Sequence, residues 1–139
     1  MFTNGKWFVL ALCSLLLWGL WGFFQKLATN HMGPRHVFVF AALGTVLIVF
    51  LTFASLRFQI DMNMKGIVFA VLAGLAGSLG GLFFVSSVSR GKASVVITMT
   101  ALYPVVTILL SFAVLREEIT IRQGIGIILA LISMVLLAE

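Results

Sequence analysis

The sequence predicts an all-α integral membrane protein with five transmembrane helices. Hydrophobic residues make up 62% of the chain and charged residues only 9%, against roughly 45–50% and about 25% in soluble domains. Five segments contain no Asp, Glu, Lys or Arg, and only short connections separate them. A chain of this composition cannot cover a water-facing surface, so its natural environment is a bilayer.

The five apolar segments have the lengths of membrane spans. A helix needs about 20 residues, within a range of about 17–25, to cross the hydrocarbon core. Lipid cannot satisfy backbone polar groups, so each span must be helical or part of a closed barrel. The apolar runs lack strict alternation, which selects helices. The expected spans are residues 7–25, 37–56, 66–89, 93–115 and 123–138, and the last, which is short, can be extended by residues 119–121.

The basic residues indicate contact with lipid and exclude a nucleic-acid partner. The formal net charge is +5, but the nine Lys and Arg residues are scattered at the edges of the apolar runs. Nucleic-acid binding needs a continuous basic patch. Basic residues that flank spans interact with lipid head groups and orient the helices.

Catalysis, a metal site and a cofactor are not expected. No connection is long enough to hold a soluble domain, and no span contains a His, Asp or Glu. The sequence around Ser78 is similar to a nucleophile elbow but lacks its first glycine and any activating base. Cys13 is expected to be a small apolar filler. The chain is therefore predicted not to be an enzyme.

The positive charges are almost balanced between the two sides of the membrane, which leaves two interpretations of orientation. Cytoplasmic connections normally carry an excess of Lys and Arg. A single orientation can be set by other signals, or copies can insert both ways and pair antiparallel, which would reproduce the inverted repeats of larger transporters. The N-terminal side carries five residues, Lys6, Arg57, Lys65, Arg116 and Arg122, and the other carries four, Lys26, Arg35, Arg90 and Lys92.

The first span carries a polar and aromatic stripe. Spacings of four, three and four residues place its members on one helix face. A tryptophan at a helix end is commonly an interface anchor, and Trp7 fits that interpretation. Trp18 lies deeper, which favours a cavity. The stripe consists of Ser14, Trp18, Trp21 and Gln25.

The third span is rich in small residues at intervals of four. Such patterns let helix backbones approach closely. Helix packing is therefore favoured over substrate contact at Gly74, Gly77, Ser78 and Gly81.

The fourth span combines a proline with a polar stripe. Pro104 lies at the midpoint of residues 93–115, where it removes a backbone hydrogen bond and frees the carbonyl of Thr100. Tyr103, Thr107 and Ser111 continue the face of Thr100. These hydroxyls can satisfy the kink and bond neighbouring helices, or they can line a substrate path. The stripe extends beyond the proline, which favours the path, so the predicted cavity residues here are Thr100, Tyr103, Pro104 and Thr107.

Several motifs resemble a known family. Leu17-Trp18-Gly19 followed by Lys26 is similar to the first helix of EamA-type domains, in the drug/metabolite transporter superfamily. The fourth and fifth spans resemble that family in residues 102–107, residues 115–120, Gln123 and Gly126. Glu117 matches a recurrent glutamate of the family, expected to cap a helix or form an ion pair. Arg116 stands where the family usually has a glycine, and the second span lacks the arginine that many members carry. The membrane-embedded glutamate of the related four-helix multidrug exporters is also missing, which argues against proton-driven drug export.

The resemblance implies a transporter that works as a pair of halves. Family members often contain two inverted five-helix domains, whereas residues 1–139 are similar to a single five-helix member, so a homodimer is implied, possibly antiparallel. The resemblance further implies a cavity lined by the first, third and fourth helices of each half.

The expected function is a carrier for small metabolites, such as amino acids or related amphipathic solutes, that works by alternating access. Its expected location is a bacterial or archaeal cell membrane. A non-transporting scaffold or partner subunit is the alternative, and a passive channel is a further one, although the aromatic stripe suits binding better than free conduction.

Overall fold

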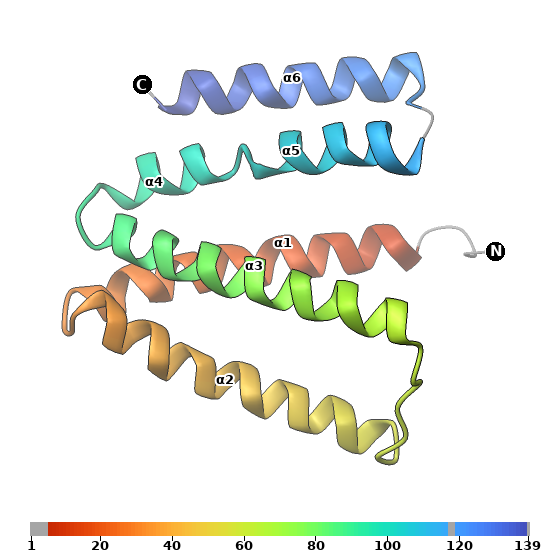
Figure 1. Cartoon of the computed structure of the whole chain (residues 1–139). Helices are drawn as coiled ribbons and strands as arrows, with labels where there is room; N and C mark the ends of the chain where they lie inside the picture. Colours follow the sequence, from red (N-terminus) through yellow and green to blue (C-terminus); the bar gives the residue numbers. More distant parts are fainter. Residues whose placement is uncertain (1–5, 117–118, 139) are drawn as a thin grey trace. The chain divides into compact units, whose positions relative to one another are not determined.

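The protein is built from helices, as the composition predicts (Figure 1). The computed structural model describes residues 6–116 and 119–138, and no strand occurs within these two ranges. Glu117 and Glu118, and with them the expected cap or ion pair of Glu117, lie outside the described residues. In chain order the elements are α1 (Lys6–Thr29), α2 (Pro34–Ser55), α3 (Met64–Val88), α4 (Ala93–Thr100), α5 (Tyr103–Leu110), the π-helix η1 (Ser111–Leu115) and α6 (Ile121–Ala138).

Among the residues that the structure describes, four stretches are long and apolar enough to cross a membrane. They are α1, α2, α3 and the stretch Ala93–Leu115, which α4, α5 and η1 form together. A shorter apolar stretch, Gly124–Ser133, lies in α6. The prediction of an all-helical membrane protein is confirmed, and the count of five spans is supported in outline, with the fifth the shortest.

The chain divides into two compact units, Met1–Arg90 and Gly91–Glu139. The first contains α1, α2 and α3, which contact one another. The second contains α4, α5, η1 and α6, in which α4 packs against α6. The expected organisation of the chain as one five-helix domain stays a prediction.

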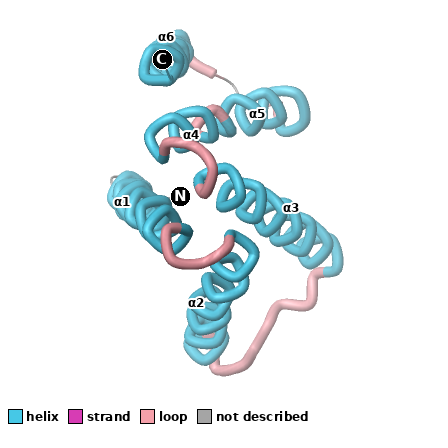
Figure 2. The backbone as a smooth tube through the Cα atoms, turned by 90° about the vertical axis from the view of Figure 1, so that its left-hand side faces the viewer, coloured by secondary structure: helices cyan, strands magenta, loops and turns pink. Residues whose placement is uncertain are grey.

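Within the first unit, the three helices are packed together at one end. α2 and α3 lie closest where α2 begins and α3 ends, and they diverge toward the connection between them (Figures 1 and 2). We call this end, residues 22–37 and 81–90, the closed end. It contains every buried residue of the described part of the unit: Gly22, Gln25, Val37, Val85 and Val88.

Local chemistry explains where these helices begin and end. Gly33 is the N-cap of α2 and Pro34 its first residue, and a proline in the first turn replaces an N–H that would have no helical partner. At the end of α2, Arg57 and Phe58 adopt positive φ angles of 53° and 60°. The Phe58 N–H then donates to the Phe53 carbonyl at 3.1 Å, which is the closing bond of a Schellman-type cap.

Candidate functional site

The outer half of the α1 stripe is largely exposed. Trp18 is 63% exposed, and Ser14 is also exposed. The Ser14 hydroxyl donates to the Leu10 carbonyl at 3.0 Å, a bond within its own helix that keeps a polar group satisfied in lipid. Both side chains therefore remain accessible to a solute or a neighbouring helix.

The inner half of the stripe enters the closed end. Trp21 stacks on Phe84 of α3, with ring centroids 4.8 Å apart and planes inclined by 28°, and it remains 42% exposed. Gln25, one turn further on, is only 5% exposed. The predicted stripe thus runs from an open helix face into the contact between α1 and α3.

Gln25 is buried without full hydrogen bonding. Its Oε1 accepts no hydrogen bond from any residue that the structure describes. Burial of an unsatisfied acceptor costs about 1–3 kcal/mol. Such a group in a native structure needs an explanation, such as a water, a ligand or a functional role.

Lys26 bridges α1 and α3 at the same end. Its Nζ donates to the backbone carbonyl of Val88 at 2.9 Å, in a part-buried position. Val88 is the last residue of α3, where carbonyls lack helical N–H partners and the helix dipole favours a cation. A hydrogen bond from a charged donor contributes about 1.5–3 kcal/mol. Lys26 therefore acts as a C-cap supplied from another helix.

The role of Lys26 was missed by reasoning from the sequence. Its charge marked the end of the apolar run, so the expected span stopped at residue 25, whereas α1 continues to Thr29. The signals that could have found it were its position one residue beyond the stripe and its place in the family resemblance.

The fourth span is interrupted where Pro104 predicted a kink. α4 ends at Thr100, Ala101 and Leu102 form a turn, and α5 begins with Tyr103 and Pro104. The Leu102 N–H donates to Met99 at 3.3 Å and the Val105 N–H to Leu102 at 3.0 Å. These bonds span three residues instead of four. Because proline has no N–H, it cannot donate to the Thr100 carbonyl.

The residues of the polar stripe lie on both sides of this interruption, Thr100 before it and Tyr103 and Thr107 after it. The Thr100 hydroxyl donates to the carbonyls of Val96 at 2.9 Å and Ile97 at 3.0 Å. Tyr103 is 56% exposed, Thr107 is exposed and Pro104 is half-buried. This stripe belongs to the second unit and the α1 stripe to the first. Their joint lining of a cavity stays a prediction.

Beyond α5 the backbone widens into η1, which the sequence did not predict. The residue after it, Arg116, has a left-handed backbone with φ of 53°, and its N–H donates to the Ser111 carbonyl. A wider turn closed by a left-handed residue is a common way for a helix to end. The span therefore departs from α-helical hydrogen bonding twice, at residues 101–102 and at Ser111–Leu115.

The small residues of α3 fall into two groups. A methyl group built at Gly81 would lie 3.5 Å from Phe38 Cε2 of α2, so this glycine sits at a helix contact. Built at Gly74 or Gly77 it would meet no described atom within 4 Å, and Ser78 is exposed. The expected packing role of Gly74, Gly77 and Ser78 stays a prediction about a neighbour outside the first unit.

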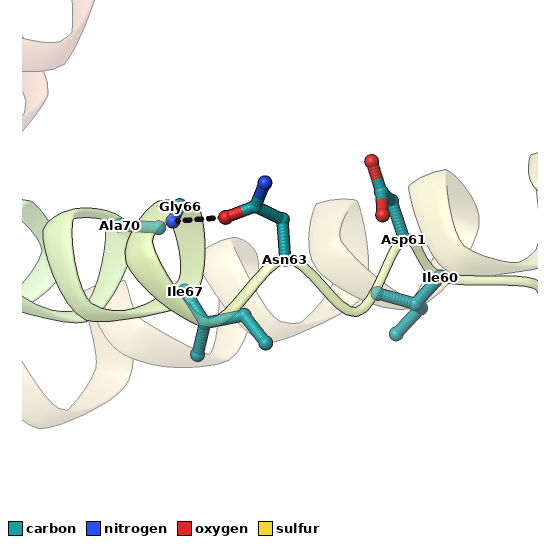
Figure 3. A pocket seen from close by; sticks show the side chains of 6 residues that line it. All are labelled: Ile60, Asp61, Asn63, Gly66, Ile67 and Ala70. Atoms are coloured by element: carbon teal, nitrogen blue, oxygen red, sulfur yellow. Dashed lines mark hydrogen bonds between the residues drawn. The ribbon is translucent and has the colours of Figure 1, made fainter.

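A hollow of about 320 Å³ lies at the start of α3, lined by Ile60, Asp61, Asn63, Gly66, Ile67 and Ala70 (Figure 3). The side-chain oxygen of Asn63 is already used, because Asn63 Oδ1 accepts a hydrogen bond from the Gly66 N–H at 3.1 Å and so caps the helix. Asp61 alone supplies a charge. No group of three metal-ligating side chains occurs among the residues that the structure describes. The amide of the hollow is therefore explained by the N-terminal cap of α3, and the residues that line the hollow do not form a binding site.

Comparison with known proteins decides the family. The model of the EamA-like transporter family matches residues 5–138, nearly the whole chain. The chain belongs to the EamA-like transporter family. The apolar helices and this membership make it a multi-pass integral membrane protein. The EamA-like family is one of transporters, which agrees with the expectation that the chain is not an enzyme.

A curated relative has the same extent. It is an uncharacterised protein of Methanocaldococcus jannaschii, 25% identical over 130 residues, and the match covers 94% of each chain. No solved structure matches this EamA-like chain.

Replacing Pro104 tests the cause of the interruption. Pro104→Ala supplies an N–H that can bond the Thr100 carbonyl, so the helix should become continuous. We expect hydrogen–deuterium exchange of a peptide spanning residues 98–107 to slow by about tenfold, since a backbone bond is gained. Pro34→Ala is the matched control, because Pro34 lies in a first turn where an N–H adds no helical bond. Unchanged exchange around residue 104 would show that the break has another cause.

Proposed function

We propose that this EamA-like protein is a carrier for small metabolites, such as amino acids or related amphipathic solutes, that works by alternating access. The interrupted fourth span carries the proposal. In lipid, non-helical backbone is tolerated only where protein covers it or where it lines a water-filled cavity. The interruption lies between Thr100 and Tyr103, near the middle of the span, where transporters commonly bind their substrates.

The chemistry of the two stripes supports an amphipathic solute. Ser14, Gln25 and Thr107 carry polar groups, and Trp18 and Tyr103 add exposed aromatic faces. Away from their terminal turns, the spans contain no charged residue. A solute with hydrogen-bonding groups and an apolar portion suits such a surface better than one that needs a counter-charge.

We further propose that two five-helix halves pair to form the carrier, in the cell membrane of a bacterium or archaeon. The almost equal Lys and Arg counts on the two sides support insertion in both orientations, and hence an antiparallel homodimer with the inverted-repeat symmetry of larger transporters. The open face of α3 at Gly74 and Gly77 offers room for the backbone of a second copy.

A non-transporting scaffold is the second candidate, and the same open face of α3 favours it. A scaffold would depend on Gly74 and Gly77 but tolerate changes in the polar stripes. A carrier would depend on the stripes as well. Substitution of the stripes therefore separates the two functions.

We expect Tyr103→Ala and Trp18→Ala each to lower transport at least tenfold while membrane insertion stays intact. The measurement is uptake of a panel of radiolabelled amino acids into liposomes containing the purified protein. Leu109→Ala and Phe23→Ala are matched controls, since both side chains are exposed and lie off the stripes. Full transport by the stripe variants would contradict the carrier, and variants absent from the membrane would show a packing role instead.

Orientation is tested by a single cysteine at Asn30, in a Cys13→Ser background. Asn30 is exposed in the turn after α1, and its replacement leaves the Lys and Arg balance unchanged. We expect a membrane-impermeant maleimide to label this cysteine from both faces of the membrane. Labelling from one face alone would remove the antiparallel homodimer and leave a parallel assembly or an oppositely oriented partner.

A further inference from the structure

The closed end brings together two polar side chains whose energetic effects oppose each other. Lys26 Nζ donates to the last carbonyl of α3, that of Val88. The neighbouring Gln25 is 5% exposed, with an Oε1 that accepts no hydrogen bond from the described residues. Lys26 therefore stabilises the packed arrangement of α1 and α3, and Gln25 destabilises it.

We propose that Lys26 and Gln25 act as an opposed pair of positioning residues that sets how readily the closed end opens. Lys26 holds the end closed. Gln25 favours opening, because its amide oxygen can then take a hydrogen bond from water or from a polar N–H or O–H group of a solute. The pair serves the alternation proposed above, and in that respect rests on the proposed function.

Three hydroxyls of the closed end are already used within their own helical segments. The hydroxyls of Thr29, Ser86 and Ser89 donate to the carbonyls of Lys26, Leu82 and Ser86, each at 2.8 Å and each within its own helical segment. None of these protons is directed to Gln25 Oε1. The amide oxygen therefore gains a donor only when the surroundings change.

The packing of the unit makes such an opening local. Every buried side chain of the described part of α1, α2 and α3 lies at the closed end, and α2 and α3 diverge away from it (Figure 2). Separation of α1 from α3 would therefore break the Lys26 bond and the Trp21–Phe84 stack, and it would open the end at which Val85 and Val88 are buried. Little buried surface would be lost elsewhere in the unit, because its buried residues lie at the closed end.

Opposed contributions of similar size are what a carrier requires. A carrier must populate two states within one transport cycle, so neither can be favoured by more than a few powers of ten. A charge-assisted bond and an unsatisfied buried acceptor have comparable magnitudes. Their opposition keeps the closed end stable enough to seal and weak enough to open.

The experiment measures access to the closed end without any solute. Val88, fully buried, is replaced by cysteine in a Cys13→Ser background. The full chain is purified in dodecyl maltoside, and the rate of its modification by a water-soluble maleimide is measured. The backbone carbonyl that Lys26 contacts is retained in Val88→Cys.

Three variants carry opposite expectations. Lys26→Met, which keeps the side-chain length and removes the charge, should raise the labelling rate about tenfold. Gln25→Leu, which removes the unsatisfied oxygen at nearly constant volume, should lower the rate about tenfold. The double variant should return close to the parent rate, and Lys26→Arg should remain near it. The matched reporter, Asn30→Cys in the adjacent turn, should label equally fast in all of them.

These results distinguish the opposed roles of Lys26 and Gln25 from a general loss of structure, and they test the pair independently of the proposed transport function. Faster labelling in Gln25→Leu would overturn the opposition, since it would mean that Gln25 stabilises the closed end. Unchanged labelling in Lys26→Met would overturn the role of Lys26. A Lys26→Met protein that merely misfolds would stay fast in the double variant. If the labelling pattern is observed while no solute is transported, the proposed role of Lys26 and Gln25 is supported and the proposed carrier function is contradicted.

Discussion

A bilayer satisfies no backbone hydrogen bonds, and this constraint governs the whole structure. It explains why an apolar chain of this kind is helical and why its connections are short. It also gives meaning to each departure from α-helical bonding. The turns that end α2 and α3 lie beside charged residues at the membrane edges, where water is available. The interruption at Ala101 and Leu102 lies within a span, where only covering protein or a water-filled path can satisfy the freed groups.

In the first unit, hydrogen-bonded polar side chains are satisfied in two ways, within their own helices or at the closed end. Several of its hydroxyls donate to carbonyls of their own helices, as Ser14 does to Leu10 and Thr52 does to Ile48, so these polar groups are satisfied without a neighbouring helix. Polar bonding between helices is concentrated at the closed end, in Lys26 and Val88. That end holds α1 and α3 together, and Gln25 is buried there. The polar residues with the strongest energetic effects thus lie where the packing is tightest.

The sequence predicts the spans well, because the cost of burying charge in lipid leaves a clear mark on composition. The break at Pro104 is equally predictable, since a missing N–H is a local property of one residue. The bond from Lys26 to Val88 joins residues 62 positions apart, and no local pattern encodes it. The burial of Gln25 and the contact of Gly81 with Phe38 depend on the same packing between helices. The π-helix η1 has no proline or glycine to announce it, and the family motif beside it gives no backbone geometry.

The most direct test of the account is solute exchange by the purified protein in liposomes. Vesicles are loaded with one unlabelled amino acid, and entry of its radiolabelled form is compared with entry into empty vesicles. A carrier that alternates between two states returns faster when loaded, so we expect saturable entry that is accelerated by solute on the far side. Entry that neither saturates nor responds to internal solute would indicate a channel. Absence of protein-dependent entry across the full amino-acid panel and related amphipathic solutes would contradict the proposed carrier.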